Sequence, residues 1–136
     1  MARWLVKTEP DEYSFADLQR KGRDVWDGVR NNVALKHLRS MRRGDEVFVY
    51  HTGNARAVVG IARVVSEPYP DPASGDPRHA VVDLEAVRAL ERPVSLAAIK
   101  ADPAFAGWEL VRNSRLSVMP VPGELWERIL AMSAGS

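Results

Sequence analysis

Four short segments carry polar side chains where a plain scaffold would not need them, and three of the four also hold an aromatic ring. They are Trp4–Pro10, Val25–Asn32, Val49–Asn54 and Arg112–Pro120. A stacking face with hydrogen-bond donors and acceptors beside it suits a planar ligand with a polar edge, such as an unstacked nucleobase. Recognition of this kind needs neither a metal nor a redox cofactor, and we expect none.

The first two segments supply a stacking ring and polar groups around it. Lys7, Thr8 and Glu9 end a short apolar run, at a strand end of the kind that often offers ligand groups. Trp26 stands among polar residues just before a predicted helix, with Asn31 placed to hydrogen-bond a ligand edge. A structural interpretation competes, with Trp26 as a core anchor and Asn31 as the helix N-cap. Both interpretations stay open for this segment.

The other two segments add hydroxyl, imidazole and guanidinium groups. Tyr50 and His51 are adjacent in a predicted strand, so they point to opposite faces and one is expected to face a cavity or solvent. Ser114, Arg115 and Ser117 form a polar group directly before an apolar strand. Each of these two segments alone is more typical of ordinary structure. Taken together, the four predict a pocket for a base.

Phosphate contacts are expected from arginines, because guanidinium groups bind phosphate oxygens in a bidentate manner. The partial positive charge at the start of the predicted helix favours the same ligand. For Lys36 and Arg39 an ordinary solvated helix face is the favoured interpretation. The candidates for phosphate binding are Arg30, Arg42, Arg43 and Arg115.

Composition narrows the class of protein. The chain has 136 residues, enough for one domain over residues 1–136, a net charge of +1 and no cysteine. Disulfide scaffolds and thiolate sites are therefore excluded, and the three histidines lack metal-ligand spacing. No nucleophile elbow, phosphate loop or H-E-x-x-H motif occurs, so an enzyme is not expected. Neither a signal peptide nor an apolar run of ~18 residues is present, which predicts a cytoplasmic protein without a membrane partner.

Strand-like and helix-like stretches alternate along the chain. Helices are predicted from Ser14 to about Arg20, over Asn31–Met41, over Val94–Lys100 and from Pro122 onward. The proline-rich segment Ser66–Arg78 is expected to be irregular. Strands are predicted over Arg3–Lys7, Glu46–His51, Ala57–Val65, Ala80–Leu90 and Arg115–Val121, with a hairpin connection at Thr52–Arg56.

These elements predict an α+β fold around a mostly antiparallel sheet. Five or six strands in so short a chain would manage their edges most easily by curling into a small barrel. We therefore expect a curved antiparallel β-barrel flanked by short helices.

Five ordered blocks of the sequence resemble the EVE domain family. The resemblance runs from Trp4 to about Met132, nearly the whole chain. The blocks are Trp4–Pro10, Val25–Asn31, Met41–Asp45 with Val47–His51, Val59–Val64 and Ser114–Val121.

The resemblance implies a PUA-like fold, related to PUA, ASCH and YTH domains, and a reader of modified bases such as 5-methylcytosine and its oxidised forms. YTH domains hold a methylated adenine in an aromatic cage, and the Val25–Trp26 step is similar to the place of a cage tryptophan. The base-stacking role is therefore carried over to Trp26. Bordering positions are implied for Lys7, Thr8, Glu9, Tyr50, His51 and the Ser114–Ser117 run. Trp108, Tyr69 and Trp4 are the candidates for a second aromatic wall.

The function predicted from sequence is a non-enzymatic module that binds DNA or RNA and reads one base, probed first by Trp26→Ala. Two alternatives stay open. One is a regulatory domain that binds a small planar ligand, and the other is a catalytic relative that modifies RNA or a nucleotide. The sequence leaves protein partners unknown, and it does not choose between DNA and RNA.

Overall fold

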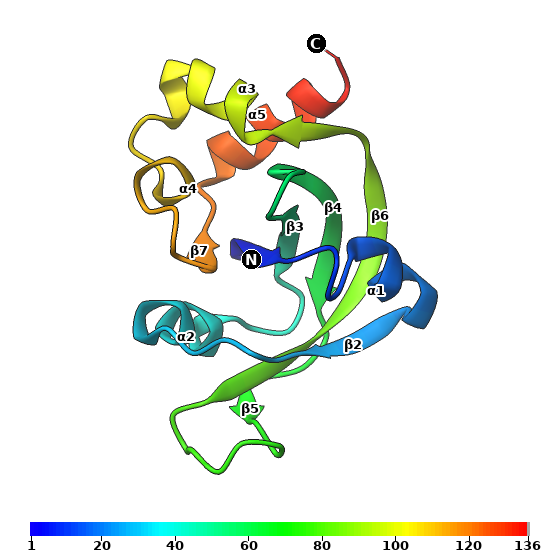
Figure 1. Ribbon diagram of the computed structural model, residues 1–136, viewed down its shortest axis with the longest axis vertical. Coiled ribbons are helices and arrows are strands. Elements are labelled where there is room, and N and C mark those ends of the chain that lie inside the picture. Colours follow the sequence, from blue (N-terminus) through cyan, green and yellow to red (C-terminus); the bar gives the residue numbers. More distant parts are fainter. Residues whose placement is uncertain (136) are drawn as a thin grey trace.

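The computed structural model describes residues 1–135, which form one mixed α+β arrangement (Figure 1). The strands are β1 (Arg3–Thr8), β2 (Arg23–Trp26), β3 (Glu46–His51), β4 (Ala57–Val64), β5 (Tyr69–Pro70), β6 (Ala80–Ser95) and β7 (Val118–Pro120). The helices are α1 (Phe15–Lys21), α2 (Asn32–Ser40), α3 (Leu96–Ala101), α4 (Glu109–Arg112) and α5 (Gly123–Ser133), with a 3₁₀ turn at Pro103–Phe105. No helix within residues 1–135 is long and apolar enough to cross a membrane.

The sheet runs in the order β2-β6-β4-β3-β1-β7, and β5 pairs with β6 off this path. The long strand β6 bends across the molecule and pairs with both β4 and β2 (Figure 1). Register shifts on either side of Gly60 accompany this bend, as β-bulges do. A Cβ at Gly60 would lie 2.5 Å from the Phe15 ring, so the glycine lets α1 pack directly on β4.

The predicted barrel is wrong, because the sheet is open. Its two outer strands, β2 and β7, are not paired with each other. The β1–β3 pair is parallel, whereas the other pairs are antiparallel, and β7 has only three residues. Helix α2 contacts both β7 and β6 and so lies where the sheet would have to close. The pocket beside Trp26 lies on this open side.

Most predicted elements occur at their expected places. The Ser14 cap is confirmed as a capping box with Asp17, and Asn31 caps α2 by accepting from the Val33 and Ala34 N–H groups. The missed elements are short. Strand β2 was not predicted, and the segment Ser66–Arg78 contains the two-residue β5. Helix α3 begins later than predicted because β6 stays paired with β4 as far as Ser95.

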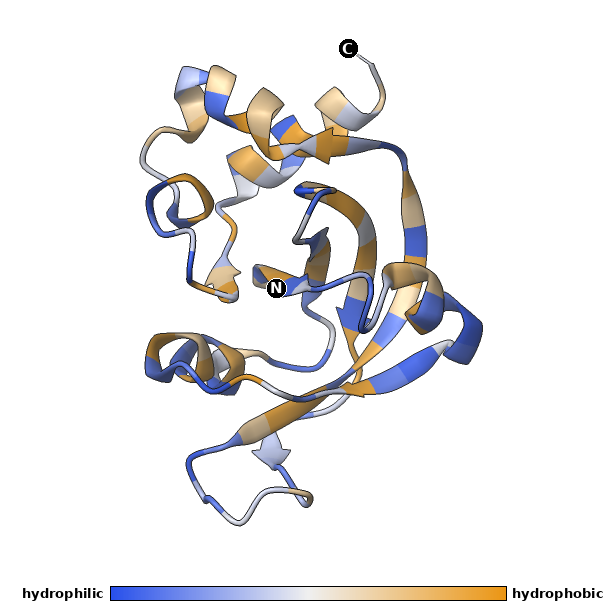
Figure 2. Ribbon diagram, viewed as in Figure 1, coloured by the Kyte–Doolittle hydropathy of each residue, from blue (hydrophilic) through white to orange (hydrophobic). Residues whose placement is uncertain are grey.

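The core lies between the sheet and its covering helices. Trp126 of α5 stacks on Phe48 of β3, with ring centroids 3.7 Å apart. Helix α2 buries Ala34, Leu35 and Leu38. Figure 2 shows hydrophilic residues gathered at the α1–β2 turn, whereas the strands in the middle of the molecule are largely hydrophobic. This core fixes the ends of β1 and β2, where the site lies.

Candidate functional site

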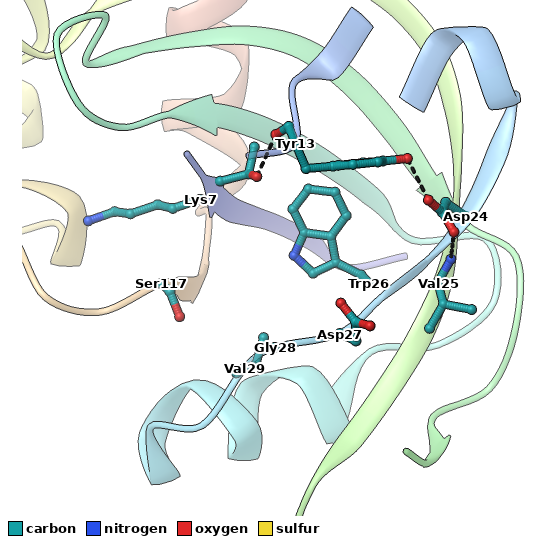
Figure 3. A pocket seen from close by; sticks show the side chains of 10 residues that line it. Lys7, Tyr13, Asp24, Val25, Trp26, Asp27, Gly28, Val29 and Ser117 are labelled. Carbon is teal, nitrogen blue, oxygen red and sulfur yellow. Dashed lines mark hydrogen bonds between the residues drawn. The ribbon is translucent and has the colours of Figure 1, made fainter. Parts of the chain in front are cut away.

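A pocket of about 290 Å³ opens where the sheet fails to close. Its walls come from the end of β1, the turn before α1, the end of β2 with the residues after it, and the residue before β7 (Figure 3). Segments far apart in the sequence thus meet at one hollow. The lining residues are Lys7, Thr8, Tyr13, Asp24, Val25, Trp26, Asp27, Gly28, Val29 and Ser117.

An aromatic pair forms the apolar wall of this pocket. The rings of Tyr13 and Trp26 meet edge to face, with centroids 6.1 Å apart and an interplanar angle of 77° (Figure 3). This is a favourable arrangement for two ring quadrupoles. Within residues 1–135 no buried side-chain nitrogen or oxygen lacks a partner. The Trp26 indole N–H, which has no acceptor among these residues, is therefore reached from the pocket.

Hydrogen bonds hold the Tyr13 ring in place. Its hydroxyl donates to Asp24 Oδ2 over 2.6 Å, and the Thr8 hydroxyl donates to the Tyr13 carbonyl over 2.6 Å. Asp24 also accepts from Lys21 Nζ and from the Val25 N–H. Burial and the bond to Asp24 raise the pKa of Tyr13, so the phenol stays protonated. Partial burial of Asp24 opposes ionisation, but its hydrogen bonds outweigh that effect and lower its pKa.

The turn after β2 brings a carboxylate to the pocket. Gly28 has φ of 80°, a left-handed conformation that favours glycine, and it lets the chain turn from β2 toward α2. Val29 is buried beyond it and anchors the turn in the core. Asp27 is exposed and lines the pocket, and its side chain has no hydrogen-bond or ion-pair partner within residues 1–135. A ligand in the pocket therefore meets a free carboxylate.

Lys7 separates this pocket from the next hollow. Its backbone N–H donates to the Ser117 carbonyl over 3.0 Å, which joins β1 to the segment before β7. Its side chain extends away from Trp26 (Figure 3), and Nζ donates to the Ser114 carbonyl over 3.0 Å. Burial lowers the pKa of Lys7.

Four of the residues predicted to contact a base line this one pocket, namely Trp26, Lys7, Thr8 and Ser117. The other five lie outside its lining. Tyr50 and Ser114 line the hollow on the far side of Lys7. The Asn31 side chain serves as the cap of α2, and its contact with a base stays a prediction.

Glu9 and His51 lie at the ends of β1 and β3, where their side chains tie the following turns together. Glu9 Oε2 accepts from the Thr52 hydroxyl over 3.2 Å. His51 Nε2 accepts from the Phe15 N–H over 3.0 Å, at the first residue of α1. Burial lowers the pKa of His51, against the opposing charge of Glu9. Both side chains therefore hold the frame around the pocket.

The predicted phosphate ligands are scattered. Arg42 and Arg43 lie just before β3, where Arg42 donates to the Arg39 and Met41 carbonyls and Arg43 donates to the Val65 carbonyl after β4. The pocket lies near the Thr8 end of β1. Because β1 and β3 run in parallel, these two arginines lie at the opposite end of the strand pair. Arg30 lies 3.8 Å from Asp71, and Arg115 is exposed.

Sequence reasoning missed Tyr13 as the second aromatic wall. Trp4 and Trp108, two of the predicted walls, donate their indole N–H groups to Asp45 and to the Pro120 carbonyl, away from the pocket lining. The third, Tyr69, donates its hydroxyl to Asp83. The one available signal was the position of Tyr13, directly before the Ser14 cap of α1. Within residues 1–135 no group of three acidic or histidine side chains is arranged to hold a metal.

Comparisons with known proteins identify the family of this chain. The sequence profile of the EVE domain matches residues 2–132. Thymocyte nuclear protein 1 from Homo sapiens is 32% identical over an alignment of 165 positions, gaps included, which covers 96% of this chain and 73% of that protein.

Two solved structures share the fold closely. An NMR structure of a Rhodopseudomonas palustris protein has 43% identity and a TM-score of 0.93, covering 98% of this chain and 94% of that one. A crystal structure of human THYN1 protein in complex with 5-methylcytosine-containing DNA has 28% identity and a TM-score of 0.89, covering 98% of each chain. Because the EVE profile spans nearly all of the sequence, this chain belongs to the EVE domain family.

Proposed function

We propose that the pocket beside Trp26 holds one base of DNA, a methylated cytosine above all, and that the chain is a nucleic-acid-binding module without catalytic activity. The observation that carries the proposal is the Tyr13–Trp26 pair beside the Asp27 carboxylate, which has no partner within residues 1–135. The structural likeness to human THYN1 protein, whose crystal structure contains 5-methylcytosine DNA, supports the same ligand class.

The size of the pocket suits a single base. A volume of about 290 Å³ lies just below the range for drug-sized ligands, roughly 300–1,000 Å³, as a smaller ligand requires. Stacking of a base on an aromatic side chain contributes ~1–3 kcal/mol. A base inside a duplex cannot reach such a pocket, so the ligand is a flipped or single-stranded nucleotide.

The polar groups match the edge of cytosine. Carboxylates accept from the cytosine amino group, and Asp27 offers a free one at the pocket. The Ser117 hydroxyl both donates and accepts, so it suits the ring nitrogen or carbonyl next to that amino group. Val25 and Val29 supply apolar contact for a methyl group on the ring. Stacking, edge recognition and methyl contact thus come from one hollow.

A binding role is supported by how the pocket carboxylates are used. Asp24 is occupied by bonds from Tyr13, Lys21 and the Val25 N–H, and it serves to position the Tyr13 ring. Asp27 also lines the pocket, and its carboxylate has no hydrogen-bond or ion-pair partner within residues 1–135, so it is available to bind a ligand. We also infer a PUA-like fold, supported by the mixed α+β sheet and membership of the EVE family.

The test compares binding of matched oligonucleotides that carry cytosine or 5-methylcytosine, in DNA and in RNA. Trp26 belongs to the core, so Trp26→Ala would cost about 3–5 kcal/mol of stability, and Trp26→Leu is the better variant. Trp26→Leu is expected to lower affinity by about 10-fold to 100-fold, the equivalent of one lost stacking interaction. Trp108→Leu is the matched control, because it removes a buried indole outside the pocket lining.

The two variants separate binding from folding. The proposal expects Trp108→Leu to lose stability and keep affinity, and Trp26→Leu to lose affinity and the preference for the methylated base. Equal affinity of wild type and Trp26→Leu, measured where both are folded, would refute the stacking role. An oligonucleotide altered in mass after incubation with the protein would refute the non-catalytic role.

A further inference from the structure

A second, positively charged hollow opens on the far side of Lys7. It has a volume of about 210 Å³, and three of its nine lining residues are cationic while none is acidic. We call it the basic hollow. Its lining residues are Lys7, Tyr50, Thr52, Gly53, Arg56, Leu96, Lys100, Leu110 and Ser114.

Lys7 places its charge in the basic hollow. The ammonium lies 5.6 Å from the centroid of the Tyr50 ring, and its hydrogen bond goes to the uncharged Ser114 carbonyl. Its aliphatic stem meanwhile lines the base pocket, from which the side chain points away (Figure 3). One side chain therefore forms the partition between the two hollows.

The other two cations also lack acidic partners. Neither Arg56 nor Lys100 forms an ion pair within residues 1–135. The Glu9 carboxylate adjoins the rim at Gly53, but it accepts from the Thr52 hydroxyl and the Asp11 N–H and lies outside the lining. Three positive charges around one small hollow repel each other, and an anion among them would offset that repulsion.

The backbone at Arg56 adopts an unusual conformation. Arg56 has φ of 41°, the one positive φ at a non-glycine residue within residues 1–135. An arginine rarely adopts this conformation, and such strain is concentrated at functional sites. The Leu96 N–H donates to the Arg56 carbonyl over 2.8 Å and so locks the turn against the start of α3.

We propose that the basic hollow binds the backbone phosphate next to the base that is held in the Trp26 pocket. The inference rests on the proposed function, because it takes the occupant of the first pocket to be part of a nucleic acid. With Lys7 shared, the nearest anion to the basic hollow is the phosphate of that nucleotide or its neighbour. A third hollow of about 260 Å³ also contains Arg56 and Lys100, so the strand can continue along the hairpin and α3.

The variants that test this remove charge without harming the fold. Arg56→Gly suits the positive φ, and Lys100→Ala lies at an exposed helical position, so the double variant R56G/K100A is expected to fold normally. The matched control K36A/R88A removes the same two charges from exposed positions that line neither hollow.

Binding is measured with a single-stranded DNA that carries one 5-methylcytosine. It is then measured with two further strands, in which an uncharged methylphosphonate replaces the phosphate on the 5′ side or on the 3′ side of that nucleotide. In wild type, one of the two methylphosphonates is expected to weaken binding by about tenfold at low salt and to flatten the slope of log affinity against log salt by about 0.7. In R56G/K100A the affinity is already lower, and the same methylphosphonate has no further effect.

Each outcome decides between the two proposals. If both methylphosphonates affect wild type and R56G/K100A equally, or K36A/R88A loses as much affinity, the phosphate site is refuted while the base pocket stands. If Trp26→Leu changes nothing but R56G/K100A does, the proposed function fails instead.

Inorganic phosphate is titrated separately, with amide shifts of Arg56 and Lys100 as the readout. Shifts with inorganic phosphate but no effect of any methylphosphonate would assign the hollow to a free anion and overturn the proposal.

Discussion

Trp4 and Trp26 have nearly the same exposure, 6% and 7%, but their surroundings differ in kind. Trp4 lies near the start of β1 and donates its indole N–H to Asp45 Oδ2 over 2.9 Å. Trp26 lies at the end of β2 beside the other end of β1, and its indole N–H has no acceptor within residues 1–135. Burial therefore does not separate a structural tryptophan from one that we propose to bind a ligand. The two side chains differ instead in whether the indole N–H has an acceptor within residues 1–135.

The same contrast extends to the acids at the two ends of the β1–β3 strand pair. We call the end at Asp45 the closed end, and the end at Thr8, where the Trp26 pocket lies, the open end. Asp45 is buried and accepts from the Ala2 N–H, the Trp4 indole and the Arg42 N–H, so its oxygens are fully used. Asp27 is exposed at the pocket and has no partner within residues 1–135. A closed network stabilises the fold, whereas an open one is available to a ligand. The predictions below test this division.

The largest effect is expected at the closed end. Asp45→Ala leaves the buried Trp4 indole N–H and two part-buried backbone N–H groups without an acceptor, and an unsatisfied buried group costs about 1–3 kcal/mol. We expect a loss of about 2 kcal/mol or more in the free energy of unfolding, measured by urea denaturation. Affinity for 5-methylcytosine DNA should be unchanged under conditions where the variant is folded. A loss below about 1 kcal/mol would mean that the Asp45 network is less important than its geometry indicates.

Sequence patterns predicted one side of this contrast better than the other. Trp26 and Lys7 stand out locally, as an aromatic ring among polar residues and as a charge at a strand end, and both line the pocket. Tyr13 could not be found in this way, because its role depends on pairing of β2 with β6, which brings Asp24 within reach of its hydroxyl. Strand β2 itself is four residues long and polar at its start, too short for periodicity to reveal.

The basic residues show the same limit. Arg42 and Arg43 form a conspicuous pair in the sequence, but the parallel register of β1 and β3 places them at the closed end. Arg56 and Lys100 are far apart in sequence, and no local pattern links them. They meet because Ala57 pairs with Ser95, which sets the hairpin beside α3. Long-range register, which the sequence alone does not disclose, decides which charges share a surface.

Tyr13→Phe is expected to have the next largest effect. The change keeps the ring but removes the hydroxyl that donates to Asp24, a charge-assisted hydrogen bond of 2.6 Å. The ring becomes free to tilt, so we expect the affinity for 5-methylcytosine DNA to fall by about fivefold, close to 1 kcal/mol. Asp24→Ala, which removes the acceptor of this bond, is the companion variant and should behave alike in calorimetric titrations. Full affinity in both variants would show that the ring is held by packing alone.

Arg42→Ala with Arg43→Ala is expected to have a smaller effect on binding. These guanidinium groups are engaged with backbone carbonyls at the closed end, so they add only long-range attraction for a polyanion. We expect a loss of about twofold at low salt that vanishes near physiological ionic strength, measured by fluorescence anisotropy. A loss equal to that of R56G/K100A would move the phosphate path to the closed end and contradict the division between the two regions.

The smallest effect is expected at His51, which belongs to the frame of the open end. Its Nε2 accepts from the Phe15 N–H and so must be unprotonated, and burial lowers its pKa below the usual 6.5. The unfolded chain therefore takes up a proton first as the pH falls. The stabilising contribution of the neutral ring is complete well above pH 6.5 and decreases as the pH falls through 6.5 toward the lowered folded value.

His51→Gln separates this titration from all others, because an amide oxygen can accept from the Phe15 N–H at any pH. The ring is partly exposed and solvent screens it, so we expect a difference of about 2 °C or less in melting temperature between pH 7.5 and pH 5. Wild type should lose that amount and His51→Gln should not, while both bind 5-methylcytosine DNA equally at neutral pH. Reduced binding by His51→Gln at neutral pH would instead place the imidazole in contact with the ligand, and the open end would then extend beyond the Trp26 pocket.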